Sequence, residues 1–228
     1  MPDKIYRFSN AYISFIMQRF CTWRIEGLEN VPKEGGLIII SNHISNFDPP
    51  LLSCSIPRRM YFLSKRGIFK PGVAQFLRAF GAYPVGRDGQ DLEAFNWSRR
   101  ILTQGGAVCL FPEARRAPGA KMVTALPGTA LLALRARATL LPVAVTGTQH
   151  LTPLPRIFFP VGNFTVRIGK PFTLPEAPRI RREQLDALTT SMMLKVAELL
   201  PPEYRGVYQL PSGTKPNPSG QSEQPSHN

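Results

Sequence analysis

His43 and Asp48 lie five residues apart in the stretch Ser41-Asn42-His43-Ile44-Ser45-Asn46-Phe47-Asp48-Pro49-Pro50. A histidine can accept the proton of a hydroxyl group, and a carboxylate can orient the ring from its other nitrogen. On a continuous helix this offset is a rotation of about 140°, so the two side chains would not meet. They can meet if residues 44–47 form a turn and Asp48, followed by two prolines, opens the next helix. The spacing therefore predicts a general base with its orienting carboxylate, without a protein nucleophile.

A His–Asp pair at this spacing also fits a simpler role, as a local hydrogen bond or a helix cap. The surrounding sequence favours catalysis. The run Leu37-Ile38-Ile39-Ile40 just before the pair is short, apolar and β-branched, which is typical of a buried strand. A histidine just past the end of such a strand lies where α/β sheets usually bind their ligands.

Polar clusters follow other predicted strands at the point where each strand ends. Lys65 and Arg66 follow a strand at 60–63, Arg87 follows one at 82–85, and Glu113, Arg115 and Arg116 follow one at 107–111. Parallel strands would bring these ends, with Asn42 and His43, to one edge of the sheet. The resulting cleft would suit a phosphate-bearing substrate, because arginine and lysine bind phosphate oxygens. Each cluster alone would be an ordinary solvated basic loop.

The elements that must position these residues alternate between strands and helices. Besides the strands above, helices are predicted at about 72–80, 90–104, 128–137 and 182–200, and strands at 23–28, 140–146 and 163–168. This alternation predicts an α/β fold with a mostly parallel central sheet and helices on its faces. A chain of 228 residues suits one such domain, placed at residues 23–210. Residues 211–228, rich in Pro, Ser, Gly and Gln, are expected to be disordered.

Residues 1–22 are predicted to form an amphipathic helix before this domain. Apolar side chains fall on one side of its helical wheel, namely Ile5, Phe8, Tyr12, Phe15, Ile16 and Phe20. This side either covers the core or lies in a membrane interface, with basic groups meeting anionic headgroups. No stretch has the length and apolarity of a spanning helix, and no signal peptide is evident. A soluble or membrane-surface protein is therefore expected.

The net charge of +13 indicates a polyanionic partner: nucleic acid, an anionic membrane surface or phosphorylated substrates. Nucleic acid is the weakest of these, because no helix-turn-helix, zinc-finger or RNA-recognition signature is present. Cys21, Cys54 and Cys109 are widely spaced in apolar surroundings, so we interpret them as core residues in a reducing compartment. The candidate site residues do not require a metal.

Five motifs occur in the order and approximate spacing of a known family. They are Asn42-His43 with Asp48 (N-H-x4-D), Lys65 with Phe69-Lys70-Pro71, Gly81-Ala82-Tyr83-Pro84-Val85-Gly86-Arg87, Phe111-Pro112-Glu113-Ala114-Arg115-Arg116 (F-P-E-G-T-R in the family), and Leu141-Pro142-Val143-Ala144-Val145. This ordered set, over about residues 23–170, resembles the glycerolipid acyltransferases, particularly the 1-acylglycerol-3-phosphate acyltransferases.

The resemblance implies acyl transfer from an acyl thioester, acyl-CoA or acyl carrier protein, to the free hydroxyl of lysophosphatidic acid. The product would be phosphatidic acid, which is used in phospholipid synthesis. The transfer would proceed without an acyl-enzyme intermediate. His43 would be the general base and Asp48 its orienter. Acceptor binding is expected of Asn42, Lys65, Arg87, Glu113, Arg115 and Arg116. The resemblance also implies that no cofactor is needed, and that the protein is peripheral or monotopic at the cytoplasmic face of the cell membrane.

The chain departs from the family pattern at Ala114-Arg115, where the family has Gly-Thr. This adds a side chain and a charge beside the acceptor site, so another lysophospholipid or a glycolipid precursor is an alternative acceptor. The region before His43 is also short for the family's N-terminal membrane-binding part. A non-catalytic, basic membrane-binding protein is a further alternative, but such a relative would more typically have lost His43 or Asp48.

Overall fold

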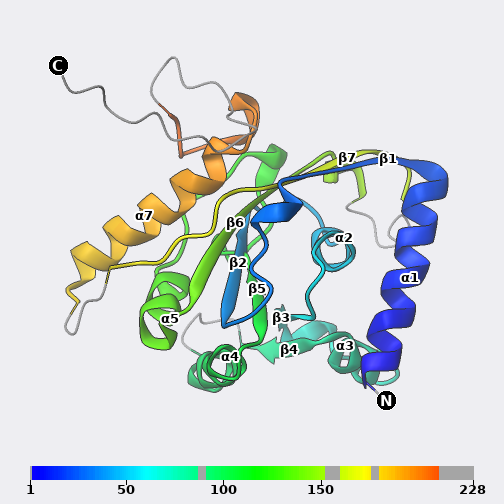
Figure 1. The fold of residues 1–228 in the computed structure, drawn as a ribbon, viewed down its shortest axis with the longest axis horizontal. Helices are drawn as coiled ribbons and strands as arrows, with labels where there is room; N and C mark the ends of the chain where they lie inside the picture. Colours follow the sequence, from blue (N-terminus) through cyan, green and yellow to red (C-terminus); the bar gives the residue numbers. More distant parts are fainter. Residues whose placement is uncertain (1, 87–90, 152–159, 176–179, 211–228) are drawn as a thin grey trace.

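A seven-stranded sheet forms the centre of the computed structural model, which describes residues 2–86, 91–151, 160–175 and 180–210 (Figure 1). The strands lie in the order β1-β7-β6-β2-β5-β3-β4. Their bounds are β1 Cys21–Glu26, β2 Leu37–Ser41, β3 Met60–Lys65, β4 Ala82–Val85, β5 Ala107–Leu110, β6 Thr139–Thr146 and β7 Gly162–Ile168. Neighbouring strands are parallel except β6 and β7, which are antiparallel. The predicted mostly parallel α/β fold is confirmed.

Helices cover both faces of this sheet (Figure 1). One face carries α1 (Pro2–Phe20), α2 (Asp48–Ser55) and α3 (Ala74–Phe80), and the other carries α4 (Leu92–Thr103), α5 (Gly128–Ala136) and α7 (Arg182–Glu198). Short 3-10 turns occur at Leu28–Asn30, Arg66–Ile68, Pro118–Ala120, Gln149–Leu151 and Pro202–Tyr204. None of the helices described is long and apolar enough to cross a membrane.

The central strand β2 is buried on both faces, which explains its uninterrupted apolar sequence. Because successive side chains of a strand point to opposite faces, Leu37 and Ile39 pack with α1, α2 and α3. Ile38 and Ile40 pack with α4, α5 and α7. The carboxyl end of β2, where His43 follows, is therefore held from both sides.

Helix α1 packs with a different side than its apolar periodicity indicates. Tyr6, Ser9 and Met17 are buried against the domain. Of the predicted apolar side, Ile16 is buried, but Ile5, Phe8, Tyr12, Phe15 and Phe20 are exposed, Phe8 to 75% and Phe15 to 64%. This placement rules out the alternative in which that side as a whole covers the core.

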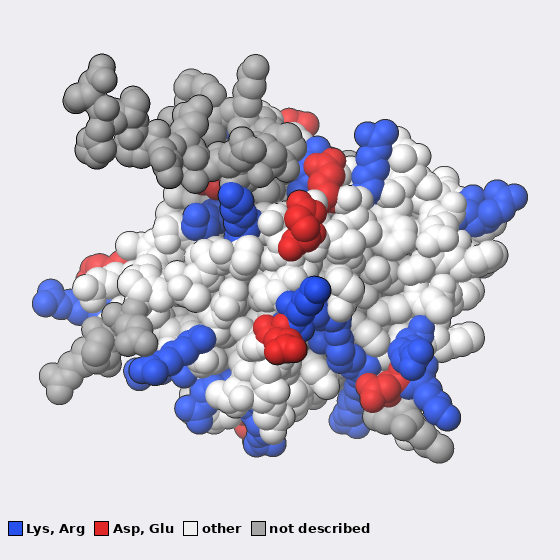
Figure 2. Space-filling view, in the orientation of Figure 1, with Lys and Arg blue, Asp and Glu red and all other residues white. Residues whose placement is uncertain are grey.

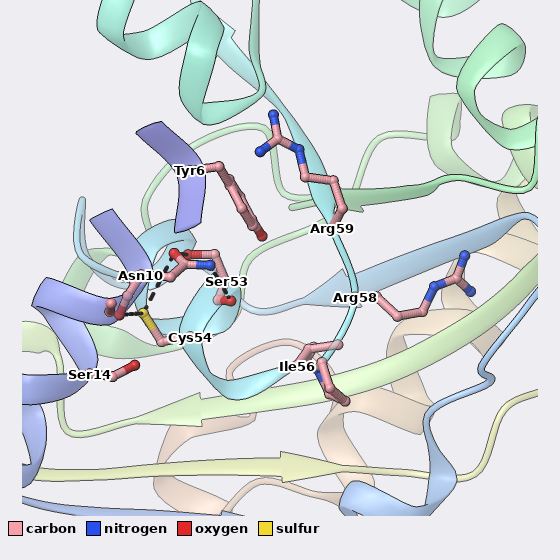
Figure 3. A pocket seen from close by; sticks show the side chains of 10 residues that line it. Tyr6, Asn10, Ser14, Ser53, Cys54, Ile56, Arg58 and Arg59 are labelled. Carbon is pink, nitrogen blue, oxygen red and sulfur yellow. Dashed lines mark hydrogen bonds between the residues drawn. The ribbon is translucent and has the colours of Figure 1, made fainter. Parts of the chain in front are cut away.

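Polar side chains at a pocket of about 300 Å³ fasten α1 to α2 (Figure 3). The Asn10 Nδ2 group donates to the Ser53 carbonyl at 2.9 Å, and the Ser53 hydroxyl donates back to Asn10 Oδ1 at 2.7 Å. The Cys54 thiol donates to the Asn10 carbonyl at 3.6 Å. The Arg59 guanidinium lies over the Tyr6 ring, 3.9 Å from its centroid. The Asn10 contacts fix α1 on the helix that begins with Asp48, and the Arg59 contact fixes it on the segment just before β3.

Candidate active site

The Asp48 carboxylate organises the loop between β2 and α2. Helix α2 begins at Asp48 with a proline in its first turn, and residues 46–47 form the preceding turn. One carboxylate oxygen, Asp48 Oδ2, lies 2.9 Å from His43 Nδ1. The same oxygen accepts the backbone N–H groups of Ile44 at 2.7 Å and Ser45 at 2.8 Å. The five-residue spacing thus places the two side chains together through a turn, as the sequence predicts.

The other carboxylate oxygen of Asp48 accepts the hydroxyl of Thr148 at 2.6 Å. Thr148 is fully buried and follows β6 after Gly147. Gly147 has a φ of 92°, and a Cβ there would overlap the carbonyl oxygen of Asn163. Only glycine therefore fits the turn that carries Thr148 beneath Asp48. Sequence reasoning missed Thr148, whose only signal is its position just past a buried strand.

The His43 ring has a defined orientation. Because a carboxylate only accepts hydrogen bonds, Nδ1 carries the hydrogen that points at Asp48. This leaves Nε2 as a proton acceptor. The ring stacks on Phe111 with centroids 4.1 Å apart. The His43 side chain is 17% exposed, while Asp48 is fully buried. Part of the His43 ring is therefore open to solvent, whereas Asp48 is closed off from it.

Asn42 and Glu113 hold the backbone around His43. The Asn42 amide exchanges two hydrogen bonds of 2.8 Å with the backbone of Val145 on β6. Glu113 accepts the N–H of His43 at 3.1 Å and that of Val123 at 2.8 Å. Both side chains are buried, and contact of Asn42 or Glu113 with the acceptor stays a prediction from the sequence. Their polar atoms are already occupied by backbone groups.

Burial raises the pKa of Glu113 to about 7 from an ordinary value of 4.5. The amides of Val123 and His43 act in the opposite direction, because they stabilise the charged carboxylate, but burial prevails. Burial also raises the pKa of the Cys109 thiol, with the nearby Asp48 charge as a second cause. A thiol held protonated in this way is a poor nucleophile.

A pocket of about 820 Å³ lies beside His43, and the neighbouring Ile44 and Ala117 are part of its wall. The Ala117 N–H donates to the His43 carbonyl at 2.6 Å. Four basic side chains also line the pocket, namely Lys65 from the end of β3, Arg115 and Arg116 after β5, and Lys121. The structure thus brings together three of the predicted basic residues and adds Lys121, which sequence reasoning did not single out.

Two other basic residues of the predicted cluster differ from these. Arg66 lies 3.9 Å from Asp91 and is not among the residues lining the pocket. Arg87 falls outside the described residues, so its role stays a prediction from the sequence. Elsewhere the cations are spread over the face seen in Figure 2 rather than gathered in one stripe. The large pocket therefore gathers basic side chains next to the loop that carries His43, although His43 itself is not among its lining residues.

Ala114 occupies a left-handed backbone conformation, with a φ of 54°. This region favours glycine, because a Cβ crowds the backbone there. Ala114 is the position at which the F-P-E-G-T-R motif has glycine. The backbone of this chain therefore keeps the conformation that suits glycine although the residue has changed.

Comparisons with known proteins agree with this geometry. A protein-family model described as Acyltransferase matches residues 22–146. A 1-acyl-sn-glycerol-3-phosphate acyltransferase of Bacillus subtilis is 24% identical over 198 residues, covering 86% of this chain and 96% of that protein. A chloroplastic 1-acyl-sn-glycerol-3-phosphate acyltransferase of Arabidopsis thaliana is 26% identical over 195 residues, covering 83% of this chain and 52% of the plant protein. The crystal structure of the 1-acyl-sn-glycerophosphate acyltransferase PlsC from Thermotoga maritima shares the fold, with a TM-score of 0.62 at 24% identity, covering 83% of this chain and 75% of that one.

Proposed function

The chain belongs to the acyltransferase family, and from this membership we propose that it transfers an acyl group from an acyl thioester to the free hydroxyl of lysophosphatidic acid. The product is phosphatidic acid, a precursor of phospholipids. The observation that carries the proposal is the contact of 2.9 Å between His43 Nδ1 and Asp48, beside a pocket lined with basic side chains. The names of the bacterial and plant relatives support the choice of acceptor.

His43 acts as the general base in this proposal. Its Nε2 atom takes the proton of the acceptor hydroxyl as that oxygen attacks the thioester carbonyl. The carbon–sulfur bond then breaks, and His43 returns the proton to the leaving thiolate. Asp48 stabilises the charged imidazolium formed in between. No acyl-enzyme forms, because the acceptor oxygen is itself the nucleophile, and acyl-CoA and acyl carrier protein are both possible donors.

The large pocket, which is lined by basic side chains, binds the acceptor phosphate in this proposal. Arg116, together with Arg87, holds the phosphate oxygens, and Lys65 and Arg115 supply further positive charge. Asn42 and Glu113 contribute indirectly, because their bonds to Val145, Val123 and His43 fix the base. The phosphate would thereby present the acceptor hydroxyl to His43.

The exposed apolar side of α1 lies in the surface of an anionic membrane. Ile5, Phe8, Tyr12 and Phe15 recur at intervals of three and four residues, which makes one stripe along the helix. Val73 and Phe76 are also exposed, and their segment packs beside α1. The surface over α1 is mainly uncharged, with basic side chains at its margins and acidic atoms beside them at its lower end (Figure 2). Aromatic groups in the interface and basic groups at anionic headgroups would hold the protein peripherally.

A different lysophospholipid or a glycolipid is the second candidate for the acceptor, because Arg115 stands where the family motif has threonine and lines the pocket. An acceptor panel tests this candidate. Replacing Arg115 by threonine is expected to raise activity toward lysophosphatidic acid relative to acceptors with larger headgroups. An unchanged order of preference would remove Arg115 from acceptor selection.

Thiol release tests the main proposal. Wild type and His43→Ala are supplied with lysophosphatidic acid and with either acyl-CoA or acyl carrier protein, and phosphatidic acid is identified by mass. The rate of the variant is expected to be lower than that of wild type by a factor of about 10²–10⁴, which is the usual contribution of a general base. Wild type that releases no more thiol than the variant with either donor would refute the proposed activity.

A further inference from the structure

The chain beyond α7 returns to the active site. Residues 202–208, the C-terminal strap, run along residues 117–126, the wall loop of the large pocket. The Met122 N–H donates to the Tyr204 carbonyl at 2.9 Å, and the Val207 N–H donates to the Met122 carbonyl at 3.2 Å. The Ala125 N–H donates to the Tyr208 hydroxyl at 2.9 Å. Three hydrogen bonds therefore join the strap to the wall loop.

The junction between strap and wall loop is closely packed. Met122, Arg205 and Tyr208 are all buried. Gly206 has a φ of 54°, and a Cβ there would overlap the carbonyl oxygen of Met122. Arg205 donates from Nε to the Leu200 carbonyl at 3.0 Å, which connects the strap to the residues just after α7. Such contacts fix one backbone against the other.

The opposite side of the wall loop is hydrogen-bonded to the loop between β2 and α2, residues 42–47, which we call the catalytic loop. The Ala117 N–H donates to the carbonyl of His43, and the Val123 N–H donates to Glu113, which also holds the N–H of His43. Between these two attachments, the wall loop lines the pocket with Ala117, Gly119, Ala120 and Lys121. The strap adds Glu203 and Tyr204 to the same lining.

We propose that the C-terminal strap is a positioning element of the acceptor site, and that Tyr208 is its positioning residue. By holding Ala125, the Tyr208 hydroxyl fixes the wall loop at the distance from His43 and the basic side chains that the acceptor requires. This inference rests on the proposed function. It extends the site beyond residues 22–146, the part of the chain that the family model matches.

A matched pair of Tyr→Phe variants tests this role. Tyr208 and Tyr6 are each 6% exposed, and each hydroxyl accepts one backbone N–H, from Ala125 and from Met60 respectively. Tyr208→Phe is expected to raise the KM for lysophosphatidic acid about three- to tenfold, as the loss of one hydrogen bond allows, with the KM for the thioester unchanged. Tyr6→Phe is expected to lower Tm comparably and to change neither KM. Equal acceptor KM values in the two variants would overturn the proposal.

Hydrogen–deuterium exchange separates this inference from the proposed function. Tyr208→Phe is expected to accelerate exchange across residues 117–126, whereas Tyr6→Phe leaves these amides as in wild type. If wild type does not acylate lysophosphatidic acid, the proposed function fails. The hydrogen–deuterium exchange of residues 117–126 still shows whether Tyr208 positions the wall loop. Unchanged exchange across residues 117–126 in Tyr208→Phe overturns the positioning role. Gly206→Ala is a second variant that pushes strap and loop apart, and the same acceleration is expected.

Discussion

The Thr148 hydroxyl donates to Asp48 Oδ1 across 2.6 Å, although the two residues lie 100 positions apart in the chain. Both side chains are fully buried. Asp48 thus receives hydrogen bonds on both oxygens, one from Thr148 and the others from the loop that carries His43. The position of the His43 ring therefore depends on the segment after β6 as well as on the catalytic loop.

Replacing Thr148 by valine is expected to lower kcat about tenfold and the free energy of unfolding by about 1–3 kcal/mol. Valine has nearly the same shape but leaves one oxygen of a buried carboxylate without its donor. Thr148→Ser keeps the hydroxyl and is the control. Steady-state kinetics and urea unfolding measure the two effects. Valine and serine variants with the same kcat would show that this bond does not position Asp48.

The pKa of Glu113 predicts a pH dependence of stability. Because its folded pKa of about 7 lies above the ordinary 4.5, the folded protein binds this proton more tightly than the unfolded chain. The resulting stabilisation is complete below about pH 4.5 and is lost as the pH rises to about 7. The glutamine side chain of the Glu113→Gln variant cannot ionise. The free energy of unfolding of wild type should therefore fall relative to that of the variant by roughly 2–3 kcal/mol across this window.

Urea unfolding at pH 5, 6 and 7 measures this difference. Glu203→Gln is the control, because it makes the same substitution at an exposed position of the same pocket. Parallel pH profiles for wild type and Glu113→Gln would mean that Glu113 does not titrate in this range.

Ala114→Gly is expected to raise the free energy of unfolding by up to about 1 kcal/mol. The φ of 54° at this position strains an alanine, and glycine adopts it freely. The control is Ala187→Gly on the exposed side of α7, where the same change should lower stability by about 1 kcal/mol. Thermal or urea unfolding compares them. Destabilisation by both substitutions would argue that Ala114 is not strained.

Membrane attachment is tested by replacing Phe8 and Phe15 with serine. Their exposed rings are expected to enter the bilayer surface, so the double variant should bind anionic phosphatidylglycerol vesicles at least about tenfold more weakly. Leu92→Ser is the control, since Leu92 is 74% exposed on α4, across the sheet from α1. Co-sedimentation measures binding. A similar loss in Leu92→Ser, or no loss in the double variant, would count against the α1 surface.

The catalytic loop could be predicted because its information is local. The apolar run of β2, the five-residue spacing from His43 to Asp48 and the prolines after Asp48 lie within one short stretch. Strand direction followed from the alternation of strands and helices, which predicted that the ends of β3 and β5 would lie near His43. Lys65 and Arg116 do line one pocket.

The remaining features depend on partners distant in the chain. Nothing near Thr148 or Asn42 in the sequence indicates that Thr148 bonds Asp48 or that Asn42 bonds Val145. The inner side of α1 was missed for the same reason, because Asn10 is held by Ser53 and Met17 is buried among residues from later elements. Hydropathy alone identified only the more apolar side, which faces outward.

The pairing of β1 with β7 has a consequence for the order in which this chain folds. Cys21 lies opposite Gly162 in this parallel pair, so β1 cannot complete its hydrogen bonds until β7 (Gly162–Ile168) has left the ribosome. The α1 helix just before it packs on α2 and α3, which are synthesised much earlier. During translation, α1 can therefore pack on α2 and α3 before β1 pairs with β7. The edge of the sheet closes late, through one of the longest-range contacts in the molecule.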